Sequence, residues 1–163
     1  MREAVALAGV VVAVAGCGGA DRLSTAEWVR QANAICAHAR ARAQALGTPA
    51  TSDEFLALAP RANRASERAL AGLRELEPPS SLEQRVKGML GDYERVVKLQ
   101  AEIIAGFRSQ RKEPRERHFP GDPRFFSIRE NAVEATDLVR RGDRRAVRLH
   151  VKECADVPWF PGV

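Results

Sequence analysis

Four segments of this chain begin with the same helix-start pattern, and this repetition constrains the fold more than any other feature. The pattern is Ser or Thr followed three residues later by Glu, at Ser24, Thr51, Ser80 and Ser127. In such a capping box the hydroxyl accepts a hydrogen bond from a backbone N–H one turn in, and the glutamate bonds back to the cap. Each instance precedes an apolar stripe, so the sequence predicts four helix starts.

The apolar stripes predict where these helices run. Apolar residues recur every three or four positions over 24–46, 52–76 and 81–110, and again from Ser127 onward. No segment alternates apolar and polar residues for long enough to be a strand. Four apolar-faced helices with mostly short connections predict an all-α fold, an up-down bundle of four main helices.

Two of the predicted helices contain residues that disfavour a helix. Pro60 predicts a kink or a break in the second helix. Gly142 and Asp143 predict an interruption of the last helix, after which helical spacing resumes as far as Cys154. The length of 163 residues suits one domain, which we expect over 24–163.

The N-terminal residues differ in composition from the rest of the chain. Ala4 to Ala15 form an uninterrupted apolar run, whereas a membrane-spanning helix needs roughly 20 such residues. The length of this run is typical of the apolar region of an export signal. We therefore expect 1–16 to be a cleaved signal peptide.

The residues that follow this run resemble a bacterial lipobox, Val14-Ala15-Gly16-Cys17. The resemblance implies transfer of diacylglycerol to the Cys17 thiol, cleavage before Cys17, and acyl chains such as palmitate on the mature N-terminus. Residues 17–23 would then be the lipidated cysteine and a flexible tether. The predicted location is the outer face of the cytoplasmic membrane. The alternatives are a secreted protein with an unmodified cysteine, or a buried helix.

The other two cysteines form an even pair once Cys17 is assigned to lipid. Cys36 and Cys154 both lie on apolar stripes, and an oxidising compartment favours a disulfide between them. Free buried thiols are one alternative. A zinc site is another, because His150 and Cys154 are four residues apart on one predicted helical face and Cys36 could join them.

The sequence offers few groups for catalysis. The hydroxyl residues of the four start patterns are assigned as caps, and no serine with a convincing base partner is apparent. The glutamates lie mainly at caps or on polar faces. We therefore expect no enzymatic activity and no cofactor.

Two basic clusters are candidate interaction surfaces, supported by a formal net charge of +5. The first surrounds the start of a long irregular loop: Arg108, Arg111, Lys112, Arg115 and Arg117. The second lies in the last helical region: Arg140, Arg141, Arg144, Arg145 and Arg148. Aromatic residues flank the clusters: Phe119, Phe125, Phe126, Trp159 and Phe160. Near a membrane, each basic residue adds about 1 kcal/mol of attraction to anionic lipid; the alternative is a solvated helix face.

The start of the mature chain resembles small, largely uncharacterised lipoproteins and secreted proteins of actinobacteria. The likeness rests on the stretch from Glu27 to Cys36, with an aromatic-aliphatic pair, then Ala-Asn-x-Ile-Cys, and on the late cysteine at Cys154. It implies an all-helical body tied by a disulfide and brings no known activity.

These observations predict a membrane-anchored, non-enzymatic interaction module. Its predicted partners are the membrane, through Cys17, and an anionic lipid, envelope protein or envelope polymer; export argues against nucleic acid. The alternative function is a helical bundle that binds a small ligand or a metal at the cell surface.

Overall fold

The structure, a computed structural model, describes residues 22–111 and 123–159, with side chains of the second range described from Phe126 onward. The predicted signal peptide and Cys17 lie outside these residues. So do the basic positions 112, 115 and 117 and the aromatic positions 119 and 160, while Phe125 lies in a helix without a described side chain.

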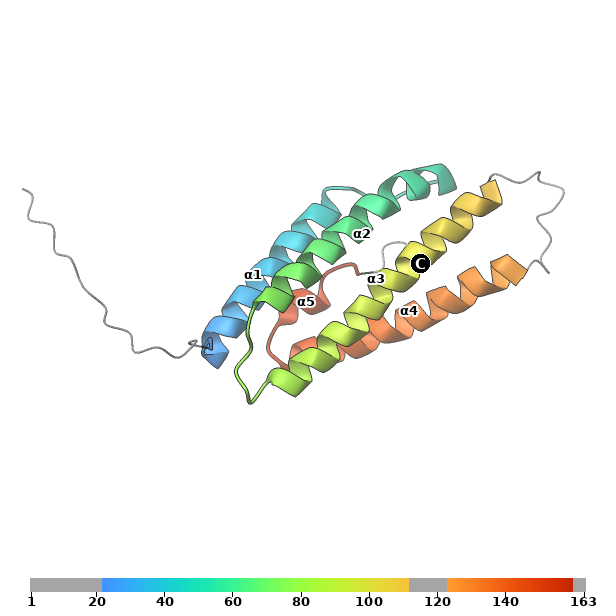
Figure 1. Ribbon diagram of the computed structural model, residues 1–163. Helices are drawn as coiled ribbons and strands as arrows, with labels where there is room; N and C mark the ends of the chain where they lie inside the picture. Colours follow the sequence, from blue (N-terminus) through green and yellow to red (C-terminus); the bar gives the residue numbers. More distant parts are fainter. Residues whose placement is uncertain (1–21, 112–122, 160–163) are drawn as a thin grey trace, which may run out of the picture.

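Five helices make up the described chain, and no strand occurs in it. The helices are α1 (Thr25–Gln44), α2 (Ser52–Glu75), α3 (Glu83–Arg111), α4 (Pro123–Arg148) and the short α5 (Lys152–Ala155). The four long helices alternate in direction along the chain (Figure 1). The predicted all-α bundle of four main helices is confirmed.

The start patterns correspond to real helix starts in three of four cases. Ser24 and Glu27 form a complete capping box. Thr51 accepts from the backbone N–H of Glu54, although that glutamate bonds to the N–H of Ala50. The third pattern ends at Glu83, the first residue of α3, but it forms no capping box: the N–H of Glu83 bonds to the backbone carbonyl of Ser80, and its carboxylate forms an ion pair with Arg22.

The fourth start pattern is wrong as a cap, because α4 begins at Pro123 and Ser127 lies inside it. Pro at the first position of a helix removes an N–H that would have no helical partner, so it favours this earlier start. Pro60 also lies inside its helix, which continues without a break to Glu75.

The predicted interruption at Gly142 and Asp143 is wrong in position, because α4 runs through both residues to Arg148. The chain leaves the helix at His150, which has a φ of 62°. The N–H of Val151 bonds to the Ala146 carbonyl and the N–H of His150 to the Val147 carbonyl. These two bonds form a Schellman motif with His150 in the left-handed position that glycine usually takes.

The core is continuous, but α1 and α4 do not pack directly against each other in the described chain. Consecutive long helices pack together, and α5 contacts both α1 and α4. Figure 1 shows α5 between them. Trp28 from α1, Tyr93 from α3 and Trp159 after α5 are all fully buried. The short segment after α4 therefore fills the space that closes the bundle.

Candidate interaction surface

The five arginines predicted as an interaction surface all lie on α4, but their side chains differ in role. Arg141 and Arg145 reach α3, where both contact Asp92, at 2.8 Å and 3.3 Å. The Asp92 side chain is only 8% exposed. Because a buried carboxylate needs a compensating charge, these two arginines hold α4 against α3.

Glycine at position 88 makes room for one of these arginines. A side-chain carbon at Gly88 would collide with the guanidinium of Arg145. The α3–α4 contact is thus built around Asp92 on one helix, a glycine one turn before it, and two arginines on the other.

The remaining three arginines are more exposed. Arg140 lies 3.7 Å from Asp137 on the same helix, and both side chains are about 70% exposed; such a pair stabilises little. Arg144 and Arg148 are exposed and form no ion pair within the described residues. These two are the predicted surface arginines that are free to meet a partner.

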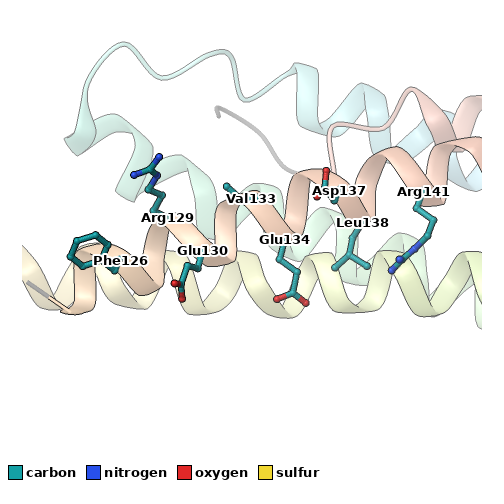
Figure 2. Close-up of a pocket in the computed structure, with 8 residues that line it drawn as sticks. All are labelled: Phe126, Arg129, Glu130, Val133, Glu134, Asp137, Leu138 and Arg141. Carbon is teal, nitrogen blue, oxygen red and sulfur yellow. The ribbon is translucent and has the colours of Figure 1, made fainter.

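The outward side of α4 also holds the largest exposed apolar side chains of the described residues. Phe126, Val133 and Val147 are 46%, 57% and 48% exposed. Phe126 and Val133 line a shallow groove of about 670 Å³ along α4, with Glu130 and Asp137 beside them (Figure 2). A groove with apolar floor residues and charged edges is typical of a surface that contacts another molecule.

A second groove lies where the α1–α2 connection meets the residues after α5. Its volume is about 430 Å³, and Leu46, Phe55, Leu58 and Pro158 contribute apolar lining. The predicted small-ligand alternative would place its ligand here, because apolar pockets of several hundred Å³ hold small molecules.

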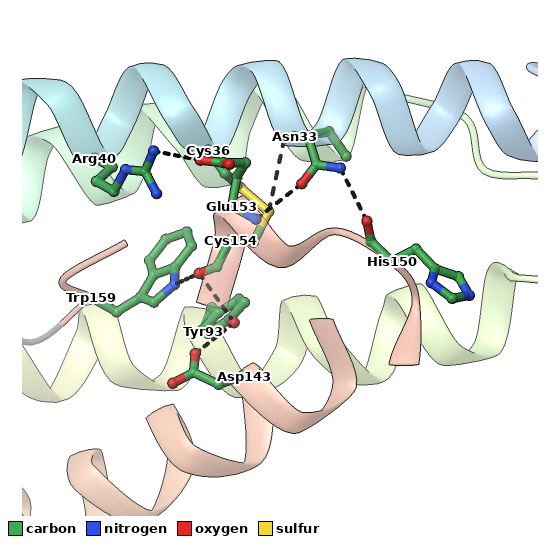
Figure 3. Close-up of a disulfide and its surroundings, with 10 residues drawn as sticks. Asn33, Cys36, Arg40, Tyr93, Asp143, His150, Glu153, Cys154 and Trp159 are labelled. Carbon is green, nitrogen blue, oxygen red and sulfur yellow. Dashed lines mark hydrogen bonds and ion pairs between the residues drawn. A yellow bond between two sulfur atoms is a disulfide. The ribbon is translucent and has the colours of Figure 1, made fainter. Parts of the chain in front are cut away.

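The disulfide predicted between Cys36 and Cys154 is present in the structure and joins α1 to α5, with the two Cα atoms 4.8 Å apart. Figure 3 shows the polar contacts around it. Asn33 donates to the carbonyl of His150 and accepts from the N–H of Glu153. Arg40 forms an ion pair with Glu153 at 2.7 Å. Helix α1 therefore holds α5 and the residues just before it at several points.

Three buried or half-buried side chains meet on the other side of the disulfide. Tyr93 stacks on Trp159 with ring centroids 4.2 Å apart, and its hydroxyl donates to Asp143 at 2.9 Å. The Trp159 indole N–H donates to the Cys154 carbonyl at 2.7 Å. This cluster links α3, α4 and the segment after α5 (Figure 3).

Burial changes the acidity of this cluster. It raises the pKa of Asp143 to about 6, with the nearby Asp156 adding to the rise and both the Tyr93 hydrogen bond and the positive charge of Arg144 opposing it. Burial also raises the pKa of the Tyr93 hydroxyl, and the negative charge of Asp143 acts in the same direction. Tyr93 therefore remains a protonated donor at neutral pH.

The structure contradicts the zinc alternative. The sulfur atoms of Cys36 and Cys154 are bonded to each other, and His150 lies outside the helices with its side chain exposed. No group of three His, Cys, Asp or Glu residues suited to a metal ion occurs in the part of the chain that the structure describes.

Sequence reasoning missed the two acids that organise the α3–α4 contact. Asp92 is next to an apolar stripe, and Asp143 was interpreted as a helix breaker. The signal that could have found Asp92 is the spacing of Arg141 and Arg145, which lie four residues apart on one helix face and so can share an acidic partner. Without the register between the two helices, that partner could not be identified.

Comparisons with known proteins identify no relative of this chain. No protein-family model, curated protein or solved structure matches it. None of the described helices is long and apolar enough to cross a membrane. Any statement of function therefore depends on the residues and on the geometry of the bundle.

Proposed function

We propose that this chain is an exported lipoprotein whose helical domain is held at the outer face of the cytoplasmic membrane by acyl chains on Cys17. The observation that carries the proposal is the Cys36–Cys154 disulfide. It leaves Cys17, which directly follows the apolar run and a lipobox-like triplet, as the one remaining cysteine of the sequence.

The compartment and the anchor are consistent with each other. Structural disulfides persist in oxidising compartments outside the cytoplasm and are rare inside it. Two or three acyl chains give stable membrane attachment, whereas a single chain gives only marginal binding. A disulfide-bonded domain behind a lipidated cysteine meets both conditions.

The domain's proposed activity is binding to an envelope partner without chemical conversion. The groove on α4 supports this proposal, because Phe126 and Val133 remain exposed there at an energetic cost to an isolated protein. Arg144 and Arg148 add unpaired positive charge farther along the same helix.

The anchor is tested by the Cys17→Ala variant expressed in the native host. We expect the wild-type protein in the membrane fraction with a mass that includes lipid, and the variant in the soluble or secreted fraction without lipid. Mass spectrometry of the intact protein and membrane fractionation measure these outcomes.

A double variant, Cys36→Ser with Cys154→Ser, is the matched control. It removes two thiols without touching the lipobox-like stretch, so it should keep both the lipid mass and the membrane fraction. A Cys17→Ala protein that stays with the membranes at an otherwise unchanged mass would contradict the anchor.

A further inference from the structure

The alternating direction of the helices gathers four chain positions at one end of the bundle. The beginnings of α1 and α3 and the ends of α2 and α4 lie together there (Figure 1). We name this end, defined by Ser24, Leu76, Glu83 and Arg148, the tether end. It is the end at which the chain arriving from Cys17 enters the domain.

Positive charge that forms no ion pair within the described residues concentrates on the α3–α4 side of the tether end. Asp92 faces Arg141 and Arg145, and Gly88 faces Arg145. One turn closer to the end, Arg85 continues the Asp92 and Gly88 face of α3 and Arg148 continues the Arg141 and Arg145 face of α4, with Arg144 one turn before Arg148.

All three of these arginines are exposed, and none forms an ion pair within the described residues. Arg85 donates one hydrogen bond to the carbonyl of Ser81 and keeps its charge uncompensated. We name Arg85, Arg144 and Arg148 the arginine edge.

The acidic residues at the tether end do not neutralise this edge. Glu83 forms an ion pair with Arg22. Glu75 and Glu77 lie at the end of α2 and just after it; α2 does not contact α4, and neither glutamate forms an ion pair with Arg85 in the described chain. Asp143 is next to Arg144 in the sequence and interacts with its charge, but it is half-buried, accepts the Tyr93 hydrogen bond and forms no ion pair with Arg144 in the described chain.

We propose that the arginine edge docks on anionic lipid headgroups and so fixes the orientation of the bundle on the membrane. This inference rests on the proposed anchor at Cys17. The cap Ser24 is the seventh residue after Cys17, and a fully extended chain spans at most about 3.5 Å per residue. The tether end is therefore held within about 25 Å of the lipid surface.

The anchor makes this weak charge attraction effective. A basic residue near an anionic leaflet shifts the equilibrium toward the bound state by about fivefold, so three shift it on the order of 100-fold. A shift of this size gives only weak membrane binding for a protein that is free in solution. A short tether, however, raises the effective concentration of the two surfaces to the millimolar range.

Hydrogen–deuterium exchange of the full-length chain on lipid vesicles tests the docking. The chain is reconstituted in vesicles of phosphatidylcholine alone or with phosphatidylglycerol added. We expect slower amide exchange in residues 81–90 and 144–151 on the anionic vesicles only. This difference should disappear near 1 M salt, where the Debye length is about 3 Å.

The triple variant Arg85→Gln, Arg144→Gln and Arg148→Gln should lose the difference between the two vesicle types. The matched control replaces three exposed arginines on α2 and removes the same charge: Arg61→Gln, Arg64→Gln and Arg68→Gln. It should keep the difference.

Three outcomes would overturn the docking proposal. One is equal exchange of the wild-type chain on both vesicle types. Another is equal loss of protection in the two triple variants. The third is protection confined to residues 126–137, which would indicate that the α4 groove, and not the arginine edge, contacts the lipid or a second copy of the chain. The mass of the intact protein shows whether Cys17 carries lipid and so tests the anchor separately. A lipidated chain whose amide exchange is not slowed on anionic vesicles refutes the docking alone. Slowed exchange in a chain that the native host leaves without lipid refutes the anchor alone.

Discussion

Asp143 is placed where three parts of the fold meet, and its protonation affects all of them. It accepts the hydrogen bond from Tyr93, whose ring stacks on Trp159. Burial favours the neutral form of the carboxyl and raises its pKa to about 6. An unfolded chain would have an aspartate pKa of about 3.9.

This difference in pKa predicts the pH dependence of stability. Between pH 4 and pH 6 the folded protein binds the Asp143 proton more tightly than the unfolded chain does. The free energy of unfolding therefore falls as pH rises through this window, as far as this group contributes, and stays lower above it. Thermal or urea unfolding from pH 4 to pH 7.5 measures the effect.

The Asp143→Asn variant isolates the contribution of this carboxyl. Its amide is neutral at every pH and its oxygen still accepts from Tyr93, so the variant should gain stability relative to wild type at pH 7.5 and lose that advantage at pH 4. The same difference between variant and wild type at both pH values would refute the assignment.

At the scale of elements, the packing of α3 against α4 depends on a glycine within each helix. Gly142 lies where the Tyr93 ring approaches α4 most closely, and a side-chain carbon there would be 2.6 Å from Tyr93 Cε1. Gly142 thus permits close packing in the middle of a helix. In the sequence Gly142 predicts a helix break, whereas in the structure it allows α3 and α4 to approach each other.

Gly142→Ala should therefore destabilise the protein. The better helix propensity of alanine favours the folded state by about 1 kcal/mol, but overlap with Tyr93 opposes it by about 1–3 kcal/mol. We expect a lower free energy of unfolding in urea denaturation.

The matched variant is Gly91→Ala on α3, where nothing lies within 4 Å of the added carbon. It gains the propensity without the overlap and should be more stable by about 0.5–1 kcal/mol. If both variants gained stability, the close packing at Gly142 would be disproved.

Most helices could be predicted from the sequence because their signals are local. Apolar periodicity and capping residues act within a few positions, so the ends of α1, α2 and α3 agree with the predictions to within about two residues. The end of α4 could not be predicted, since His150 occupies the left-handed position without the glycine that marks such an end.

At the scale of the whole molecule, the bundle is closed by a segment far shorter than a bundle helix. The four residues of α5, with Trp159 behind them, occupy the space between α1 and α4. The even pair of cysteines predicted that the end of the chain meets α1. The register that places Asp92 between two arginines is a property of the assembled helices, and the sequence does not contain it.

Reduction of the disulfide should lower stability strongly. The bond closes a loop with a sequence separation of 118, for which the chain-entropy model gives about 4–5 kcal/mol. Guanidinium unfolding with and without reductant measures the loss, and hydrogen exchange should increase first in residues 149–159. A Cys17→Ala protein is the control against intermolecular bonds, and an unchanged unfolding midpoint would contradict the prediction.

The same disulfide determines how the molecule carries mechanical force. A pull between the two ends of the chain would follow the backbone only as far as Cys36, cross the sulfur–sulfur bond and leave through Cys154. The backbone of α2, α3 and α4 is outside this load path. Only a reductant would expose those helices to the force and lengthen the chain by about 400 Å, so the redox state decides whether the domain behaves as a short link or as a long, extensible one.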